Sequence, residues 1–184
     1  MKVTEGIRLI ESGFHEKIDN STWADLGCGN GLFTKALASF LGDGSKIYAV
    51  DKVEQSLELS FNNVAIEFTK ADFVNDSFQF TNLNGVLMAN SLHYIKDKSS
   101  FLENLKKSLK QNGQIIIVEY EIEKANVWVP YPIHFNELES LLSIKGFGPL
   151  MKLGERESIF GAEKMYACSA KLLKLDLGRE IITS

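Results

Sequence analysis

The sequence predicts an α/β protein, with a mostly parallel β-sheet and helices on both of its faces. A strand at residues 22–26 stops in a glycine-rich turn and is followed by a helix at residues 32–37. Strand and helix patterns then alternate along the chain, which is typical of a parallel sheet. Residues 114–118 are apolar enough for a strand covered on both faces.

The remaining elements are expected in the following order. A short leading helix spans about residues 3–12. Further strands are expected at 46–50, 64–68, 84–89, 114–118, 150–153 and 164–171, and further helices at 53–62, 101–109 and 135–144. Ser99 or Ser100 would cap the helix at 101–109, and Asn112 with Gly113 would end it. A polar loop at 154–163 is short enough for a hairpin, so the last strand should be antiparallel, and the tail from Leu172 should fray.

Size and composition predict one domain. The chain has 184 residues, and its 45% hydrophobic content is enough to bury a core. A formal charge of −4 argues against a broad nucleic-acid footprint. No stretch approaches the ~20 apolar residues that span a bilayer, and the N-terminus lacks the apolar centre of a signal peptide. Cys28 and Cys168 lie far apart and form neither a metal-type pair nor a disulfide framework. We therefore expect a cytoplasmic protein with no metal site and no nucleic-acid or membrane partner.

The glycine-rich turn points to a bound cofactor. Gly27, Gly29 and Gly31 lack a Cβ, so the turn can approach a ligand closely. The helix that follows offers unpaired N–H groups and the positive end of its dipole. Asp51 ends the second strand, 24 positions after Gly27. An acidic residue at an offset of about 20 reaches ribose hydroxyls in βαβ nucleotide sites. The alternative is that Asp51 is a solvated charge at a strand end.

Over residues 22–171, five motifs in order resemble those of the class I S-adenosylmethionine-dependent methyltransferases. The family's "leucine, lysine, proline, glycine, glycine" turn is matched with the proline and one glycine replaced. The motifs are Asp-Leu-Gly-Cys-Gly-Asn-Gly at 25–31, Asp51 in place of the ribose acid, Ala-Asp-Phe at 71–73, Asn-Ser-Leu-His-Tyr at 90–94 and Leu-Lys-Gln-Asn-Gly-Gln at 109–114.

The resemblance implies a Rossmann-like, doubly wound sheet of seven strands in the order 3-2-1-4-5-7-6, with strand 7 antiparallel. It also implies a single methyltransferase domain over residues 1–184. Its parts would be a leading helix, a cofactor-binding half at about 22–94, an acceptor-side half at about 95–171 and a tail at 172–184. The ligand of such a sheet lies at the carboxyl ends of the strands.

The resemblance implies S-adenosylmethionine as the cofactor. Asp25 would face its ammonium side, Asp51 its ribose hydroxyls and Asp72 its adenine amino group. Asn90 would offer its backbone carbonyl to the ammonium. The implied cofactor-binding residues are Asp25, Gly27, Cys28, Gly29, Asn30, Gly31, Asp51, Lys52, Ala71, Asp72, Phe73, Asn90 and Ser91. Alternatively, Asp72 is an ordinary turn residue, Phe73 belongs to the core, and Cys28 occupies the turn because it is small.

Methyl transfer needs an acceptor atom held in line with the methyl group, and a general base is optional. His93 is the first candidate for that base, because it follows the fourth expected strand and histidine titrates near neutrality. Tyr120, at the end of the fifth expected strand, is the second. The alternative for His93 is that it only shapes the pocket.

Two aromatic residues and two prolines at 126–132 indicate a rigid wall over the entrance for the acceptor, which suits a small apolar or planar molecule. A stiff loop that packs on the core explains them equally well. The bare fold leaves room for a second copy of the chain to complete the pocket, as in a homodimer. Two other functions stay open. One is a cofactor- or partner-binding module without catalysis, and the other is a nicotinamide-dependent oxidoreductase, for which the third glycine falls one position early, at Gly31.

Overall fold

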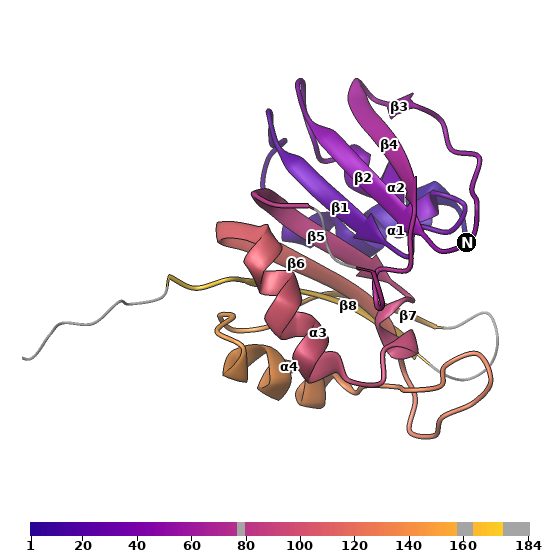
Figure 1. Ribbon diagram of the computed structural model, residues 1–184, viewed down its shortest axis with the longest axis vertical. Helices are drawn as coiled ribbons and strands as arrows, with labels where there is room; N and C mark the ends of the chain where they lie inside the picture. The colour runs from indigo at the N-terminus through magenta and orange to yellow at the C-terminus, as the bar shows by residue number, and fades with distance from the viewer. Residues whose placement is uncertain (77–79, 158–163, 175–184) are drawn as a thin grey trace, which may run out of the picture.

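The computed structural model describes residues 1–76, 80–157 and 164–174. Its elements (Figure 1) are α1 (Val3–Ile10), η1 (Glu11–Gly13), β1 (Thr22–Leu26), α2 (Leu32–Ala38), β2 (Lys46–Asp51), β3 (Ser60–Phe61), β4 (Val64–Lys70), β5 (Leu83–Ala89), η2 (Leu92–Tyr94), α3 (Lys98–Leu105), η3 (Lys106–Ser108), β6 (Leu109–Glu121), α4 (Phe135–Ile144), β7 (Met151–Glu157) and β8 (Lys164–Lys171).

All eight strands form one sheet in the order β3-β4-β2-β1-β5-β6-β8-β7. Neighbouring strands from β4 to β6 pair in parallel. β8 is antiparallel to both β6 and β7. The predicted Rossmann-like order is therefore confirmed, with the short strand β3 added at one edge, so the sheet has eight strands rather than seven.

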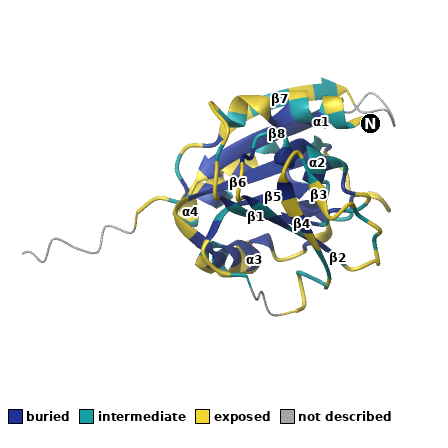
Figure 2. Ribbon diagram, turned by 90° about the horizontal axis from the view of Figure 1, so that it is seen from above, coloured by how far each residue is buried: buried dark blue, intermediate teal, exposed yellow. Residues whose placement is uncertain are grey.

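Helices cover both faces of the sheet. α1 and α2 lie on one face, and α3 and α4 lie on the other (Figure 1). Two large apolar cores result, and β6 contributes side chains to both of them. Ile115 and Ile117 pack into the core beneath α3 and α4, whereas Ile116 packs into the core beneath α1 and α2. Figure 2 shows this burial in the central strands, in contrast to the partly exposed β7 at the edge.

The prediction of a helix at 53–62 is wrong. Residues 52–59 are irregular, and Ser60–Phe61 form β3, which pairs with the start of β4. The turn chemistry explains the difference, because Asn62 and Asn63 have φ values of 50° and 65°. Positive φ at both central residues is the requirement of a type I′ hairpin turn, and asparagine meets it more easily than most residues.

The helix expected at 101–109 begins earlier and ends earlier. α3 starts at Lys98 because Asp97, rather than Ser99 or Ser100, is its N-cap, and the Asp97 carboxylate accepts the Ser100 N–H at 2.9 Å. The expected helix end at 112–113 instead lies within β6, where pairing with β5 shifts in register between Leu83 and Gly85.

At the C-terminal end of the chain, α4 and β8 match the expected ranges 135–144 and 164–171. The expected loop at 154–163 is too long, because β7 continues to Glu157 in register with β8. Residues 158–163 lie outside the described part of the chain. Leu172 does not fray, since its N–H donates to the carbonyl of Gly113 at 2.8 Å. The rest of the expected tail, from residue 175, is also outside the described residues.

Candidate active site

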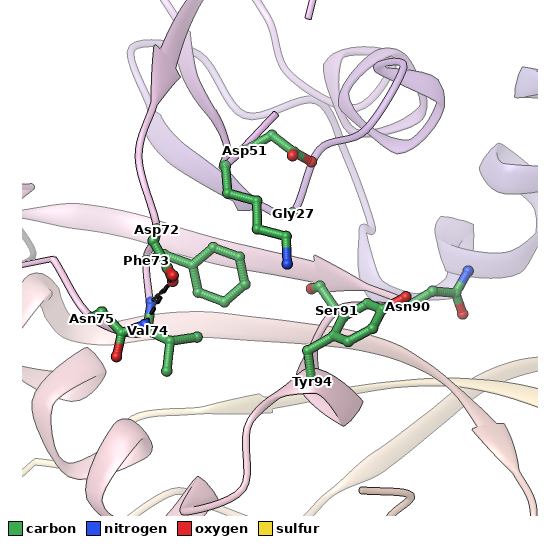
Figure 3. A pocket seen from close by; sticks show the side chains of 10 residues that line it. Gly27, Asp51, Asp72, Phe73, Val74, Asn75, Asn90, Ser91 and Tyr94 are labelled. Carbon is green, nitrogen blue, oxygen red and sulfur yellow. Dashed lines mark hydrogen bonds between the residues drawn. The ribbon is translucent and has the colours of Figure 1, made fainter. Parts of the chain in front are cut away.

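A cavity of about 570 Å³ opens at the carboxyl ends of the parallel strands. Small-molecule sites commonly measure ~300–1,000 Å³. Asp51 at the end of β2, Asp72 after β4 and Asn90 after β5 all border it (Figure 3). Its lining consists of Gly27, Asp51, Lys52, Asp72, Phe73, Val74, Asn75, Asn90, Ser91 and Tyr94.

Gly27 brings the turn after β1 close to the turn after β5. Its φ of +81° lies in the left-handed region, and a Cβ at this position would stand 2.5 Å from the Cβ of Ser91. Ser91 in turn donates from its hydroxyl to the carbonyl of Leu26 at 2.6 Å. A residue without a side chain is therefore needed where these two turns meet.

Asp51 is held by two backbone amides. Its Oδ2 accepts the N–H of Gly29 at 2.9 Å, and its Oδ1 accepts the N–H of Val53 at 2.9 Å. Each carboxylate oxygen can accept a second hydrogen bond. Because Asp51 borders the cavity, a ligand hydroxyl there could supply such a second bond.

Asp25 lies at the end of β1 but is completely buried and does not line the cavity. Its Oδ2 accepts the hydroxyl of Thr34 at 2.6 Å. Its Oδ1 has no hydrogen-bond partner among the described residues. Burial raises the pKa of this carboxyl to about 7, against the hydrogen bond from Thr34, which lowers it.

Asp72 lies in the cavity lining and also organises the turn after β4. Its side chain lines the cavity, but its Oδ1 also accepts the N–H of Val74 at 3.0 Å, and its Oδ2 accepts the side-chain amide of Asn75 at 2.9 Å (Figure 3). The bond from Asn75 is the main reason why the pKa of Asp72 is lowered. Asp72 is thus a turn residue at the edge of the site.

The structure brings together some of the predicted cofactor residues and leaves others outside the cavity lining. Those in the lining are Gly27, Asp51, Lys52, Asp72, Phe73, Asn90 and Ser91. Those outside it are Asp25, Cys28, Gly29, Asn30, Gly31 and Ala71. Gly29 still contributes through its N–H to Asp51. Burial raises the pKa of the Cys28 thiol, so it is a poor nucleophile.

Sequence reasoning did not count Val74, Asn75 and Tyr94 among the cofactor residues, although all three line the cavity. The first two follow Asp72 directly in the turn that it organises. Tyr94 is half exposed, and the Nζ of Lys52 lies 5.8 Å from the centre of its ring. A cation over an aromatic face is attractive, and the contact links the β2 side of the cavity to the β5 side.

His93 lies in η2 beside the cavity and is buried. Its Nδ1 is 2.7 Å from Oε2 of Glu119, and its backbone N–H donates to Oε1 of the same carboxylate at 3.0 Å. An ionised carboxylate can only accept, so it keeps a proton on Nδ1 and leaves Nε2 as the acceptor. The imidazole does not line the cavity, but its centre lies 4.4 Å from the ring of Tyr94, which does.

Tyr120, the second predicted catalytic residue, ends 6.2 Å from the imidazole of His93, measured between ring centres. It too lies outside the cavity lining.

His134 pairs with a carboxylate at the start of α4. Its Nδ1 lies 2.9 Å from Oε1 of Glu121, and the same oxygen accepts the first N–H of α4. That pair stabilises the start of a helix.

The segment between β6 and α4 carries exposed apolar side chains. Val127 is 89% exposed and Trp128 is 79% exposed. Asn126 shapes this segment, since its side-chain oxygen accepts the N–H groups of Trp128 and Val129. Further along, the N–H of Tyr131 donates to the carbonyl of His93 at 3.0 Å, so the segment is attached to η2.

Solved structures of similar fold come from several methyltransferases. The 1,6-didemethyltoxoflavin-N1-methyltransferase of Burkholderia thailandensis, solved with 1,6-didemethyltoxoflavin and S-adenosylhomocysteine, has a TM-score of 0.70 and 18% identity. The match covers 94% of this chain and 78% of that one. Phosphoethanolamine N-methyltransferase 2 of Haemonchus contortus, solved with S-adenosyl-L-methionine, has a TM-score of 0.67 and 13% identity over 93% and 53% of the two chains. At these identities the likeness concerns the fold.

Curated sequence relatives match over shorter segments. A probable cobalt-precorrin-6B C(15)-methyltransferase (decarboxylating) of Pyrobaculum aerophilum is 37% identical over 59 residues, which are 32% of this chain and 26% of that protein. The probable polyketide synthase 10 of Dictyostelium discoideum is 26% identical over 120 residues, which are 64% of this chain and 4% of that protein. The chain thus spans about a quarter or less of the length of these relatives.

A family model describes more of the chain. The family described as "Methyltransferase domain" matches residues 18–145, from just before β1 through α4. This range contains every residue that lines the cavity, together with His93 and Glu119. With the strand order described above, the match shows that this chain belongs to the class I S-adenosylmethionine-dependent methyltransferases.

Proposed function

We propose that this protein binds S-adenosylmethionine in the cavity at the strand ends and transfers its methyl group to a small-molecule acceptor. The proposal rests mainly on the geometry of Asp51. Backbone amides hold both of its carboxylate oxygens at the edge of a cavity of about 570 Å³. A carboxylate held in this way is pre-organised to accept two hydroxyl groups from one ribose.

The polar groups at the site fit the cationic end of this cofactor. Oδ1 of Asp25 and Oδ1 of Asn90 are buried acceptors that lack a partner among the described residues. They belong to the ends of β1 and β5, which pair side by side in the sheet. Unpaired buried acceptors are costly and call for a donor. Asn90 lines the cavity, so the cofactor's ammonium would supply a donor there, and the backbone carbonyl of Asn90 is a further acceptor for it. Asp25 would face the ammonium side of the cofactor from outside the cavity lining.

The remaining parts of the cofactor fit the other residues of the cavity. Asp51 would hold the ribose, and Asp72 with Phe73 would border the adenine. Gly27 allows the turn beneath the ligand to approach Ser91 closely. When bound, S-adenosylmethionine supplies a methyl group that its sulfonium activates for in-line displacement. The protein has to align the acceptor, and such alignment can contribute ~7–11 kcal/mol to lowering the barrier.

His93 is the group that we assign to proton transfer. Glu119 keeps the proton on Nδ1, so Nε2 is the atom that would take a proton from the acceptor. Tyr120 lies beside it and would orient the acceptor from the end of β6. If the acceptor needs no base, the His93–Glu119 pair would instead shape the wall of the pocket.

We further propose that the acceptor is a small planar or apolar molecule. Tyr94 at the cavity and Tyr131 on the segment joined to His93 are both partly exposed aromatic residues. The Burkholderia thailandensis protein of the same fold was solved with 1,6-didemethyltoxoflavin.

We also propose that the protein is cytoplasmic and forms a homodimer. Free cysteines at 28 and 168 agree with a reducing compartment. Within the described residues, none of the helices combines the length and apolar character needed to cross a bilayer.

Calorimetric titration with S-adenosylhomocysteine tests the cofactor site. Asp51→Ala should weaken binding by at least ~1–3 kcal/mol, because the ribose hydroxyls would lose their partner. Asp43→Ala is the matched control, since this exposed aspartate precedes β2 rather than following it. Failure of the wild-type protein to bind would overturn the proposal, and equal affinity of the Asp51 variant would remove Asp51 from the site.

Turnover needs a separate measurement. Pooled metabolites incubated with the protein and S-adenosylmethionine should release S-adenosylhomocysteine. A binding module without catalysis would pass the titration and release none. A nicotinamide-dependent oxidoreductase would instead transfer tritium from a labelled nicotinamide cofactor.

A further inference from the structure

Lys98 is a buried cation at an unfavourable place. It is the first residue of α3 and is only 9% exposed. Lysine is rarely buried unless it is paired, yet among the described residues Lys98 forms no ion pair. The N-terminus of a helix is also the positive end of its dipole, which disfavours a cation. A lysine that is both buried without an ion pair and placed at a helix N-terminus needs a compensating interaction.

The compensation comes from two backbone carbonyls. The Nζ of Lys98 donates to the carbonyl of Ile95 at 2.9 Å and to that of Tyr131 at 2.7 Å. Ile95 directly follows η2, whereas Tyr131 lies 33 positions after Lys98. The ammonium therefore connects two segments that are remote in sequence, and it lies 5.8 Å from the centre of the Tyr131 ring.

The same two segments meet at a second point. The N–H of Tyr131 donates to the carbonyl of His93, so Tyr131 is bound to the η2 region through both its amide and its carbonyl. Pro130 and Pro132 flank it, and each proline fixes its own φ near −65°. Tyr131 is thus a stiff point of attachment for the whole segment.

Charges nearby favour the protonated form of Lys98. Burial lowers its pKa, and the carboxylates of Glu119 and Glu137 act in the opposite direction. Glu119 is also the partner of His93. The carboxylate of Glu119 therefore orients the His93 imidazole and also stabilises the Lys98 ammonium.

We propose that Lys98 is a positioning residue, whose ammonium holds Tyr131 against η2 and thereby fixes segment 126–133 beside His93. The assignment of this segment to acceptor binding rests on the proposed function, whereas the attachment itself does not. Without the ammonium, two carbonyls lose a charge-assisted donor, and of the two hydrogen bonds that attach Tyr131 to the η2 region only that of its amide remains.

Amide hydrogen exchange, read by nuclear magnetic resonance, tests the attachment. Tyr131 carries the one backbone N–H within residues 130–132, because its neighbours are prolines. Lys98→Met keeps the aliphatic stem and removes the charge, and it should speed exchange at Tyr131 at least about tenfold by local opening. Lys96→Met, which alters an exposed lysine two positions earlier, should leave the rate unchanged. Lys98→Arg should restore most of the protection.

Further readouts separate positioning from a loss of overall stability. Amides in β1 and β2 should keep their protection in Lys98→Met, and its affinity for S-adenosylhomocysteine should stay within about twofold of wild type. With an acceptor identified by S-adenosylhomocysteine release, KM for that acceptor should rise more than kcat falls. Unchanged exchange at Tyr131 in a folded Lys98→Met protein would overturn the proposal.

Wild-type protein provides a test that does not depend on the variant folding. Acetic anhydride should modify Lys98 at least about tenfold more slowly than Lys96, since the Lys98 amine is buried and hydrogen-bonded. Equal rates would contradict the proposal. Failure to bind S-adenosylhomocysteine would overturn the proposed function and leave the exchange and labelling results as they stand.

Discussion

The cofactor side and the acceptor side of this site are built differently. On the cofactor side, Asp51 is fixed by the backbone of Gly29 and Val53, and Asp72 by residues two and three positions ahead. On the acceptor side, side chains reach across the fold. His93 pairs with Glu119, 26 positions away, and Lys98 with Tyr131, 33 positions away. The first side depends on backbone groups of its turns, even where the contact spans 22 positions, as between Gly29 and Asp51, whereas the second depends on charged side chains.

The largest effect should separate catalysis from binding. His93→Ala should lower turnover by ~10²–10⁴-fold, the usual contribution of a general base. Affinity for S-adenosylhomocysteine should hardly change, because the imidazole lies outside the cavity lining. Turnover is measured as S-adenosylhomocysteine released in the presence of an acceptor found by the metabolite screen. His134→Ala is the control, since its imidazole pairs with Glu121 at the start of α4. Unchanged turnover in the His93 variant would refute the assignment of the base.

A second substitution tests the turn geometry of the cofactor side. Gly27→Ala should lower the free energy of unfolding by ~2–5 kcal/mol, because it combines left-handed strain with overpacking against Ser91. Urea denaturation measures the loss. Gly29→Ala is the comparison, since its φ is also positive at +50° but no atom lies within 4 Å of the added Cβ. Its cost should be only the strain, ~1–2 kcal/mol. Equal losses would mean that the contact with Ser91 is unimportant.

The same difference explains what the sequence could predict. The glycine turn and the position of Asp51 are local features, so their spacing was enough to place them at one sheet edge. The strand order beyond them came from the family resemblance and is confirmed, apart from β3. The helix expected at 53–62 is absent, because Asn62 and Asn63 adopt the positive φ values of a hairpin turn.

The acceptor side was less predictable, because nothing local marks a contact between residues 26 or 33 positions apart. His93 was chosen from its place after a strand, but its pairing with Glu119 was not foreseen. Lys98 was missed entirely. A signal did exist, since it stands next to Asp97, a good N-cap residue, and a lysine in the first helical turn opposes the dipole.

Asp25 and Asp72 on the cofactor side differ in burial, so the free energy of unfolding should depend on pH differently for each. The pKa of Asp25 is raised from its usual 3.8 to about 7, so the folded state holds a proton that the unfolded state releases. The stability that this proton gives is complete below about pH 4 and is lost as the pH rises to about 7. Asp25→Asn removes this dependence. The wild-type protein should therefore lose as much as ~4 kcal/mol relative to the variant between those pH values. Parallel pH profiles of urea denaturation for the wild-type protein and the variant would contradict the raised pKa of Asp25.

Asp72 should change the pH dependence of stability in the opposite direction and by a much smaller amount. Its pKa is lowered, chiefly by the hydrogen bond from Asn75, so the ionised form stabilises the fold. That stability is present above about pH 4 and is lost as the pH falls through the lowered pKa. Because the side chain is only partly buried, Asp72→Ala should cost less than ~1 kcal/mol at neutral pH. Comparison of the Asp25 and Asp72 profiles from pH 3 to 8 measures both signs in one experiment. Two profiles of the same sign would mean that burial, rather than local turn bonding, governs both carboxylates.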